Sequence, residues 1–76
     1  MRAETRSESI ALTVNGRTRE VPRGWSVADL LASHELDARM VVVEHNRTIL
    51  RDRDALPSIR LASGDAVEIV HFVGGG

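Results

Sequence analysis

The sequence ends in three consecutive glycines, Gly74 to Gly76, directly after an apolar run that closes with Phe72 and Val73. Glycine has the widest choice of backbone conformations, so this run predicts a mobile arm. The arm would reach on the order of 10 Å from Val73, at about 3.3 Å per extended residue. Without side chains it can enter a channel that is too narrow for any Cβ atom. The carboxylate of Gly76 is then a sterically open acyl group.

A carboxylate is a poor electrophile until it is activated. Adenylation by a partner enzyme that uses ATP would make AMP the leaving group, and the acyl carbon of Gly76 could then accept a nucleophile. Attack by an amine would give an amide, and attack by a persulfide would end in a thiocarboxylate. The pattern therefore predicts a carrier that supplies delivery and orientation, while its partners supply the catalysis.

The length fits one small domain with little room for a deep pocket, which counts against a self-sufficient enzyme. The 76 residues include ten basic and eleven acidic side chains, a formal net charge of −1 and no cysteine. The basic stripe of nucleic-acid binders is missing, and disulfides, thiolate metal sites and cysteine nucleophiles are excluded. No apolar run approaches the roughly 18 residues of a membrane span. These features favour a cytoplasmic protein that binds neither nucleic acid nor membrane.

Local patterns predict the elements that hold the tail. Residues 1–9 are polar and aperiodic and are expected to form a flexible N-terminal extension. Ile10 to Val14 alternates in polarity, which is typical of a half-buried strand. Asn15-Gly16 is a strong hairpin signal, and the return strand, Thr18 to Val21, should end at Pro22 because proline cannot donate to a ladder.

A helix is expected to follow this hairpin. Ser26 is a good N-cap, and Asp29 favours the positive end of the helix dipole, although a full capping box would prefer glutamate. Trp25 and Leu30 form a hydrophobic staple. The helix should end near Ser33 to Leu36. Its amphipathic face is expected to comprise Val27, Leu30, Leu31 and His34.

The second half of the chain predicts further strands. Met40 to Glu44 is apolar and β-branched, and a short strand at Thr48 to Leu50 should follow a turn at His45-Asn46-Arg47. Residues 51–62 carry charges and Pro57, which is typical of an irregular crossing with one helical turn.

The last strand, Val67 to Val73, follows a turn at Ser63-Gly64-Asp65 and leads into the glycines. One helix across a mixed sheet of four to five strands buries a helix stripe and one sheet face. A hairpin followed by a helical crossover also lets the first and last strands pair in parallel at the sheet centre. The expected fold class is α+β, of the β-grasp or ubiquitin-like type, with a domain at 10–73 and a flexible tail at 74–76.

Alternation along the last strand separates two sets of side chains. One set, Val67, Ile69, His71 and Val73, begins in the core under the helix. Val70 and Phe72 then lie on the open sheet face. Exposed apolar residues beside a reactive tail indicate a docking site, and we assign partner docking to Val70, Phe72 and Val73.

The three histidines lack the spacing of a metal-ligand motif. His34, His45 and His71 are expected at a helix end, in a turn and on a strand. We expect surface or boundary positions for them, and we assign neither a metal site nor a catalytic residue.

The segment from Gly64 to Gly76, GDAVEIVHFVGGG, resembles the C-terminal signature of ThiS-type sulfur carriers of thiamine biosynthesis. In that family a Gly-Asp turn leads into an apolar strand and a terminal Gly-Gly. The resemblance extends upstream through Val14-Asn15-Gly16, the helix start at Ser26 to Leu31, and Val41 to Glu44. It covers most of the chain, from Ile10 onward.

The resemblance implies a specific role for the tail. An adenylating, E1-like enzyme would activate Gly76 with ATP, and a sulfur donor such as a cysteine desulfurase relay would supply sulfur for a C-terminal thiocarboxylate. Thiazole synthase would then use that sulfur for the thiazole ring of thiamine. The carrier itself would bind no cofactor and would be a monomer that forms transient complexes. Residues 1–9 are an addition to the family pattern, and Arg47 stands where such turns often have glycine.

Two other functions share the fold and the tail. The small subunit of molybdopterin synthase uses the same thiocarboxylate chemistry, although it commonly carries a proline-containing segment before the Gly-Gly that is absent here. A ubiquitin-like modifier would instead be joined through its tail to lysines of target proteins. A plain interaction module with an idle tail is a further alternative.

Overall fold

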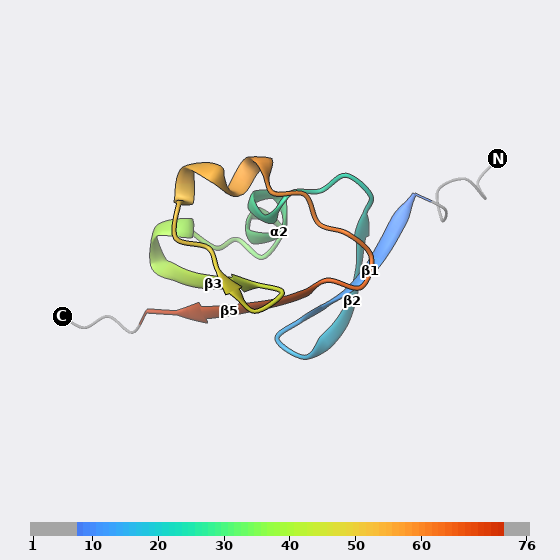
Figure 1. Ribbon diagram of the computed structural model, residues 1–76, viewed down its shortest axis with the longest axis horizontal. Coiled ribbons are helices and arrows are strands. Elements are labelled where there is room, and N and C mark those ends of the chain that lie inside the picture. Colours follow the sequence, from blue (N-terminus) through green and yellow to red (C-terminus); the bar gives the residue numbers. More distant parts are fainter. Residues whose placement is uncertain (1–7, 73–76) are drawn as a thin grey trace.

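The computed structural model describes residues 8–72, which form a mixed sheet with helical segments packed across one face (Figure 1). The strands are β1 (Ser9–Val14), β2 (Arg17–Pro22), β3 (Val41–His45), β4 (Thr48–Ile49) and β5 (Ala66–His71). The helical segments are α2 (Val27–Ser33) and two short 3-10 helices, η1 (Ala38–Met40) and η2 (Arg53–Ser58).

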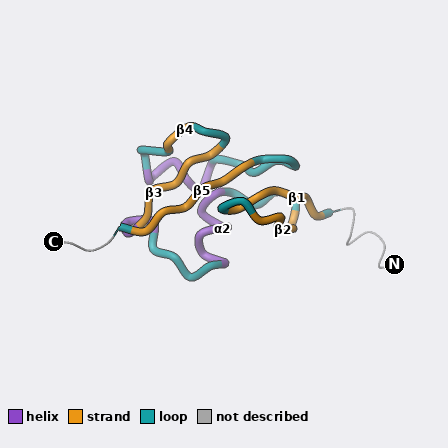
Figure 2. Tube along the Cα trace, turned by 90° about the horizontal axis from the view of Figure 1, so that it is seen from below, coloured by secondary structure: helices purple, strands orange, loops and turns teal. Residues whose placement is uncertain are grey.

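The sheet has the strand order β2-β1-β5-β3-β4. Its central pair, β1 and β5, is parallel, whereas β1–β2, β3–β4 and β3–β5 are antiparallel. Figure 2 shows β3 and β5 side by side at one end of the molecule and the β1–β2 hairpin at the other. This arrangement confirms the predicted α+β class and the β-grasp order of elements.

The hairpin turns at Asn15 and Gly16, whose φ angles are 52° and 82°. Left-handed conformations at both central positions define a type I′ turn, which matches the twist of the flanking strands. Pairing continues to Ser9 and Pro22, so β1 begins one residue before the expected Ile10. Pro22 is tolerated because β2 is an edge strand, where a missing N–H removes no ladder bond.

Reciprocal hydrogen bonds begin α2. The N–H of Asp29 donates to Ser26 Oγ at 3.1 Å, and the N–H of Ser26 donates to the Asp29 carboxylate at 2.9 Å. Aspartate therefore completes the capping box for which the sequence analysis preferred glutamate. Trp25 is partly buried against the core, and Leu30 is fully buried, as a staple requires.

The helix ends at Ser33, within the predicted range. Glu35 then adopts a left-handed φ of 59°, and the N–H of Leu36 donates back to the Leu31 carbonyl at 3.0 Å. His34 does not continue the amphipathic face of the helix as predicted, whereas the surface or boundary position expected for it as a histidine is confirmed. His34 is the C-cap and is exposed, because the chain leaves the helix at this point.

The core lies between the sheet and the helical segments. Every strand except β4 contributes to it, together with α2 and η2. Its largest fully buried side chains are Leu12, Val21, Val27, Leu30 and Val67. Within residues 8–72 no helix combines the length and apolarity needed to cross a bilayer.

The third strand begins one residue later than expected. Met40 was predicted to start it, but Met40 belongs to η1, where its N–H donates to the Asp37 carbonyl at 2.8 Å. Asp37 also caps η1, and hydrogen bonds from the Arg39 side chain and backbone lower the pKa of Asp37 to about 2. β3 ends at His45, which was expected in the turn.

The β3–β4 turn contains a strained arginine. Asn46 and Arg47 have φ angles of 51° and 74°, and a left-handed conformation costs an L-residue with a Cβ about 1–2 kcal/mol. We therefore expect Arg47→Gly to raise the free energy of unfolding by about 0.5–1 kcal/mol, after the entropy cost of glycine. Urea unfolding measures this. Arg17→Gly, in extended β2, is the matched control and should destabilise the protein; a loss of stability in both variants would contradict strain at Arg47.

The crossing between β4 and β5 is helical where one turn was predicted, and at six residues η2 is about two 3-10 turns long. Asp52 caps η2 by accepting a hydrogen bond from the Asp54 N–H at 3.0 Å. Leu56 of η2 is buried in the core, so this segment closes the helical side of the sheet.

Candidate functional site

The end of β5 carries the predicted docking residues. Val67 is fully buried at the start of this strand, whereas Val70 and Phe72 are 62% and 48% exposed. The strand spans Ala66–His71 instead of the predicted Val67 to Val73, and Phe72 follows it directly. Outward-facing apolar side chains therefore line the segment that leads to the glycines.

These side chains form one surface with residues of η1 and β3. Val42 is paired with Val70, and directly opposed residues in an antiparallel pair project to the same face. The N–H of Phe72 donates to the Met40 carbonyl at 2.9 Å, which places Met40, itself 48% exposed, next to Phe72. We call Met40, Val42, Val70 and Phe72 the open-face patch.

An acidic pair borders the open-face patch. Glu44 of β3 lies directly opposite Glu68 of β5, on the face that Val42 and Val70 occupy. Opposed like charges in a sheet are mutually unfavourable, and a basic group from a partner would relieve the repulsion. The surface thus offers an apolar area next to the tail and a carboxylate pair farther from it.

The remaining predicted site residues lie outside the described residues. They are Val73, assigned to docking, and Gly74, Gly75 and Gly76, assigned to the tail. The sulfur-carrying role of Gly76 and the docking role of Val73 therefore stay predictions.

A polar cluster that the sequence analysis missed fixes the start of β5. His45 Nε2 lies 2.7 Å from Asp65 Oδ2, Asn46 Nδ2 donates to Asp65 Oδ1 at 3.1 Å, and the Ala62 N–H donates to Asp65 Oδ2 at 2.9 Å. The Asp65 side chain is 12% exposed. Burial raises the pKa of Asp65, but the hydrogen bonds from His45, Ala62 and Asn46 outweigh it and hold the pKa below its usual value of 3.8.

Asn46 also bonds to Ala66 of β5, once through its backbone and once through its side chain. Its N–H donates to the Ala66 carbonyl, and its Oδ1 accepts from the Ala66 N–H, both at 2.8 Å. The signal for this cluster in the sequence was Asn46 in the predicted turn. Asparagine is favoured in left-handed turn positions because its short polar side chain can form local hydrogen bonds. The cluster ties the β3–β4 turn to the Gly64-Asp65 turn and so sets the direction in which β5 leaves.

The Asp65 cluster predicts a pH-dependent stability. A carboxyl whose pKa is lowered by folding stabilises the folded state above its unfolded pKa, about 3.9, and loses that contribution as the pH falls through the folded value. We expect Asp65→Asn to lower the free energy of unfolding by about 1.5–3 kcal/mol at neutral pH, the range for hydrogen bonds to charged groups. The difference from the unmodified protein should shrink below about pH 4. Urea unfolding across the acidic range checks this.

Glu20→Gln is the control for Asp65→Asn, since Glu20 is an exposed acid on β2. Its effect on stability should be small at every pH. A difference between Asp65→Asn and the unmodified protein that stays constant as the pH falls would exclude the Asp65 charge as its source.

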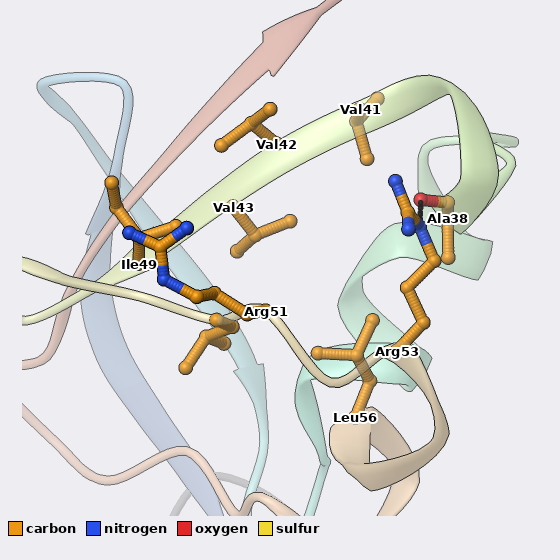
Figure 3. A pocket seen from close by; sticks show the side chains of 9 residues that line it. Ala38, Val41, Val42, Val43, Ile49, Arg51, Arg53 and Leu56 are labelled. Atoms are coloured by element: carbon orange, nitrogen blue, oxygen red, sulfur yellow. Dashed lines mark hydrogen bonds between the residues drawn. The ribbon is translucent and has the colours of Figure 1, made fainter.

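A cavity of about 390 Å³ opens beside β3 and η2. Its floor is apolar, with Val41, Val43 and Leu56, and two arginines frame it from opposite sides (Figure 3). Arg53 Nε donates to the Ala38 carbonyl at 2.8 Å, while Arg51 extends beside Ile49. The lining contains no carboxylate, histidine, hydroxyl or thiol side chain. A guanidinium has no acceptor and does not lose its proton, so these groups can bind but cannot act as a general base.

The histidines do not come together. His45 pairs with Asp65. His34, the C-cap of α2, and His71, on β5, are both exposed. Within the described part of the chain, no group of three or more His, Cys, Asp or Glu side chains is placed to hold a metal ion.

Comparisons with known proteins identify the family of this chain. The sequence model of the ThiS family matches residues 12–76, which include the second half of β1, the strands β2 to β5 and the glycine run. The chain belongs to the ThiS family. A solved relative, the thiamine biosynthesis protein ThiS from Geobacter metallireducens, superimposes with a TM-score of 0.75 and 37% sequence identity. That superposition covers 88% of this chain and all of the other.

Two curated relatives extend the comparison. The sulfur carrier protein ThiS from Bacillus subtilis is 43% identical over 51 residues, which are 67% of this chain and 76% of that protein. A thiazole synthase from Paramagnetospirillum magneticum is 35% identical over 65 residues. The match covers 86% of this ThiS-family chain but only 20% of the synthase, so the similarity is to one segment of a longer protein.

Proposed function

We propose that this protein is a sulfur carrier of thiamine biosynthesis that delivers sulfur from its C-terminal carboxyl to thiazole synthase. The observation that carries the proposal is the family match across residues 12–76, together with the Bacillus subtilis relative that is a sulfur carrier. The thiazole synthase that contains a similar segment supports the choice of synthase. In this proposal the protein is a co-substrate of its partners and not an enzyme.

The proposed chemistry takes place on Gly76. An adenylating enzyme joins the Gly76 carboxylate to the α-phosphorus of ATP and releases pyrophosphate, which gives an acyl-adenylate. The terminal sulfur of a donor persulfide attacks the acyl carbon and AMP leaves. A thiol then cleaves the resulting S–S bond, which leaves a thiocarboxylate on Gly76 and a disulfide on the donor side. ATP is consumed by the partner, and the carrier needs no cofactor of its own.

The described surface supports docking rather than catalysis. The open-face patch is apolar and lies on the segment that leads to the glycines, so a partner that binds Val70 and Phe72 would hold the tail at a fixed distance from its own active site. Holding the acyl group in place converts an encounter of two molecules into a reaction within one complex.

Intact-protein mass spectrometry tests the proposal. The full chain is incubated with the adenylating enzyme, ATP and a persulfide donor, and the expected product is heavier by the replacement of one oxygen by sulfur. Omission of ATP is the control and should prevent the gain. An unchanged mass with an active adenylating enzyme would contradict the carrier function.

The same product separates the alternatives. Purified thiocarboxylate is offered to thiazole synthase and, separately, to the large subunit of molybdopterin synthase. Thiazole formation supports the proposal, whereas sulfur transfer only to the pterin would assign the chain to molybdopterin synthesis. Covalent attachment to lysines of other proteins in a cell extract would instead identify a modifier. The cytoplasmic location, the monomeric state and the cysteine desulfurase relay stay predictions.

A further inference from the structure

β5 has a strand on both sides for only part of its length. On the β1 side, the N–H of Thr13 donates to the Asp65 carbonyl at 3.0 Å, and the N–H of Asn15 donates to the Val67 carbonyl at 2.8 Å. The parallel register ends at Val14 and Val67. Figure 1 shows the β1–β2 hairpin turning back while β5 continues alongside β3.

The side chain of Asn15 adds one more step to this ladder. The N–H of Ile69 donates to Asn15 Oδ1 at 2.7 Å, and Asn15 Nδ2 donates to the Ile69 carbonyl at 3.3 Å. In a continued parallel strand these partners would be a backbone carbonyl and a backbone N–H. Because Asn15 has already turned into the left-handed region, its carboxamide takes the place of both groups and ends the ladder at Ile69.

The next outward-directed peptide groups belong to His71. Successive residues of a strand direct their N–H and C=O groups to alternate sides. The N–H of Phe72 bonds to Met40, on the β3 side, so the groups of His71 face the β1 side, as those of Val67 and Ile69 do. Among the described residues, no strand pairs with β5 at His71 on that side.

We propose that this open edge at His71 receives an extended strand of thiazole synthase. The inference rests on the proposed function, because it assigns a contact to one of the proposed partners. The outward N–H and C=O of His71 offer one donor and one acceptor to an added strand, the groups through which strands extend an exposed sheet edge. The edge is continuous with the open-face patch through Val70 and Phe72, so one partner can cover both. The synthase is the partner for which a relative joins a segment like this chain to the same polypeptide.

Amide hydrogen exchange of the full chain, with and without thiazole synthase, tests the inference. In the free protein the amide of His71 should exchange faster than those of Ile69 and Phe72, which have acceptors in Asn15 and Met40. Asn15→Ala should accelerate exchange at Ile69. Addition of the synthase should slow exchange at His71 by at least about tenfold, since a protected amide exchanges only when its hydrogen bond opens.

Two substitutions at one position separate the backbone from the side chain. His71→Pro removes the outward N–H without removing a bond to β3, as proline is tolerated where a strand N–H faces solvent. We expect this substitution to weaken binding to the synthase about tenfold, because one interfacial hydrogen bond is lost and the acceptor on the synthase is left unpaired. His71→Thr keeps the N–H and should bind like the unmodified protein.

The outcomes distinguish this inference from the proposed function. A complex with the synthase in which His71 exchanges as fast as in the free chain overturns the added strand but leaves sulfur transfer intact. Protection of His71 that appears without the synthase, as the chain concentration rises, would assign the edge to a second copy and also overturn it. Failure of the carrier function shows separately, as the absence of the thiocarboxylate mass.

Discussion

Removal of Gly75 and Gly76 is expected to abolish sulfur loading completely while leaving the fold unchanged. The described sheet ends at His71 and the core residues of the described part all precede the glycine run. Because glycine has no side chain to bury, we expect the truncation to leave this core intact. The acyl group, however, would be displaced by two residues, or about 7 Å of extended chain. A displacement of even 1 Å at a reacting centre can cost about 100-fold in rate. Intact-protein mass after incubation with the adenylating enzyme, ATP and a persulfide donor measures the loss.

The control for this truncation is a chain that lacks residues 2–6. It shortens the protein at the other end of the sequence, ahead of β1, and should load sulfur at the normal rate. The circular dichroism and the urea midpoint of both truncated chains should match those of the full chain. Normal loading without Gly75 and Gly76 would refute the assignment of Gly76.

Phe72→Asp is expected to weaken binding to the adenylating enzyme by about 100-fold, which corresponds to roughly 2.7 kcal/mol. Buried aromatic anchors at interfaces commonly account for 2 kcal/mol or more, about 30-fold, and the variant also places a charge in the apolar contact. Phe72 is 48% exposed and is not one of the buried core residues, so we expect the stability of the free protein to change little. Binding is measured by titration calorimetry.

Ile49→Asp is the matched control for Phe72→Asp. Ile49 is also an exposed apolar residue, at 42%, but it lies on β4, opposite Glu44 and away from the end of β5. Its replacement should leave the affinity within a few-fold of normal. Equal losses of affinity in the two variants would mean that the open-face patch is not the docking site.

Local signals in the sequence predicted most of the fold. Asn15-Gly16 determines the first hairpin because both positions require left-handed backbone, and Ser26 determines the start of the helix because its hydroxyl satisfies an amide of the first turn. The alternation along the last strand predicted correctly that Val70 and Phe72 would be exposed. Each of these features depends on residues that are close together in the sequence.

The features that were missed depend on contacts between distant segments. Whether Asp65 is a turn residue or the centre of a hydrogen-bonded cluster is decided by where β3 places His45, twenty residues away. His34 has helical spacing from Val27, but the chain leaves the helix before reaching it. The ladder role of Asn15 needs the register of β1 against β5, which no local pattern contains.

The parallel pairing of β1 and β5 has a practical consequence. Parallel neighbours enter at one end of a sheet and leave at the other, so the start of β1 and the end of β5 lie on opposite sides of the molecule (Figure 1). A fluorophore or an affinity tag attached at the start of β1 joins the chain at the end of the sheet opposite the surface that partners are proposed to contact. Such a label can report complex formation without competing for the surface under test.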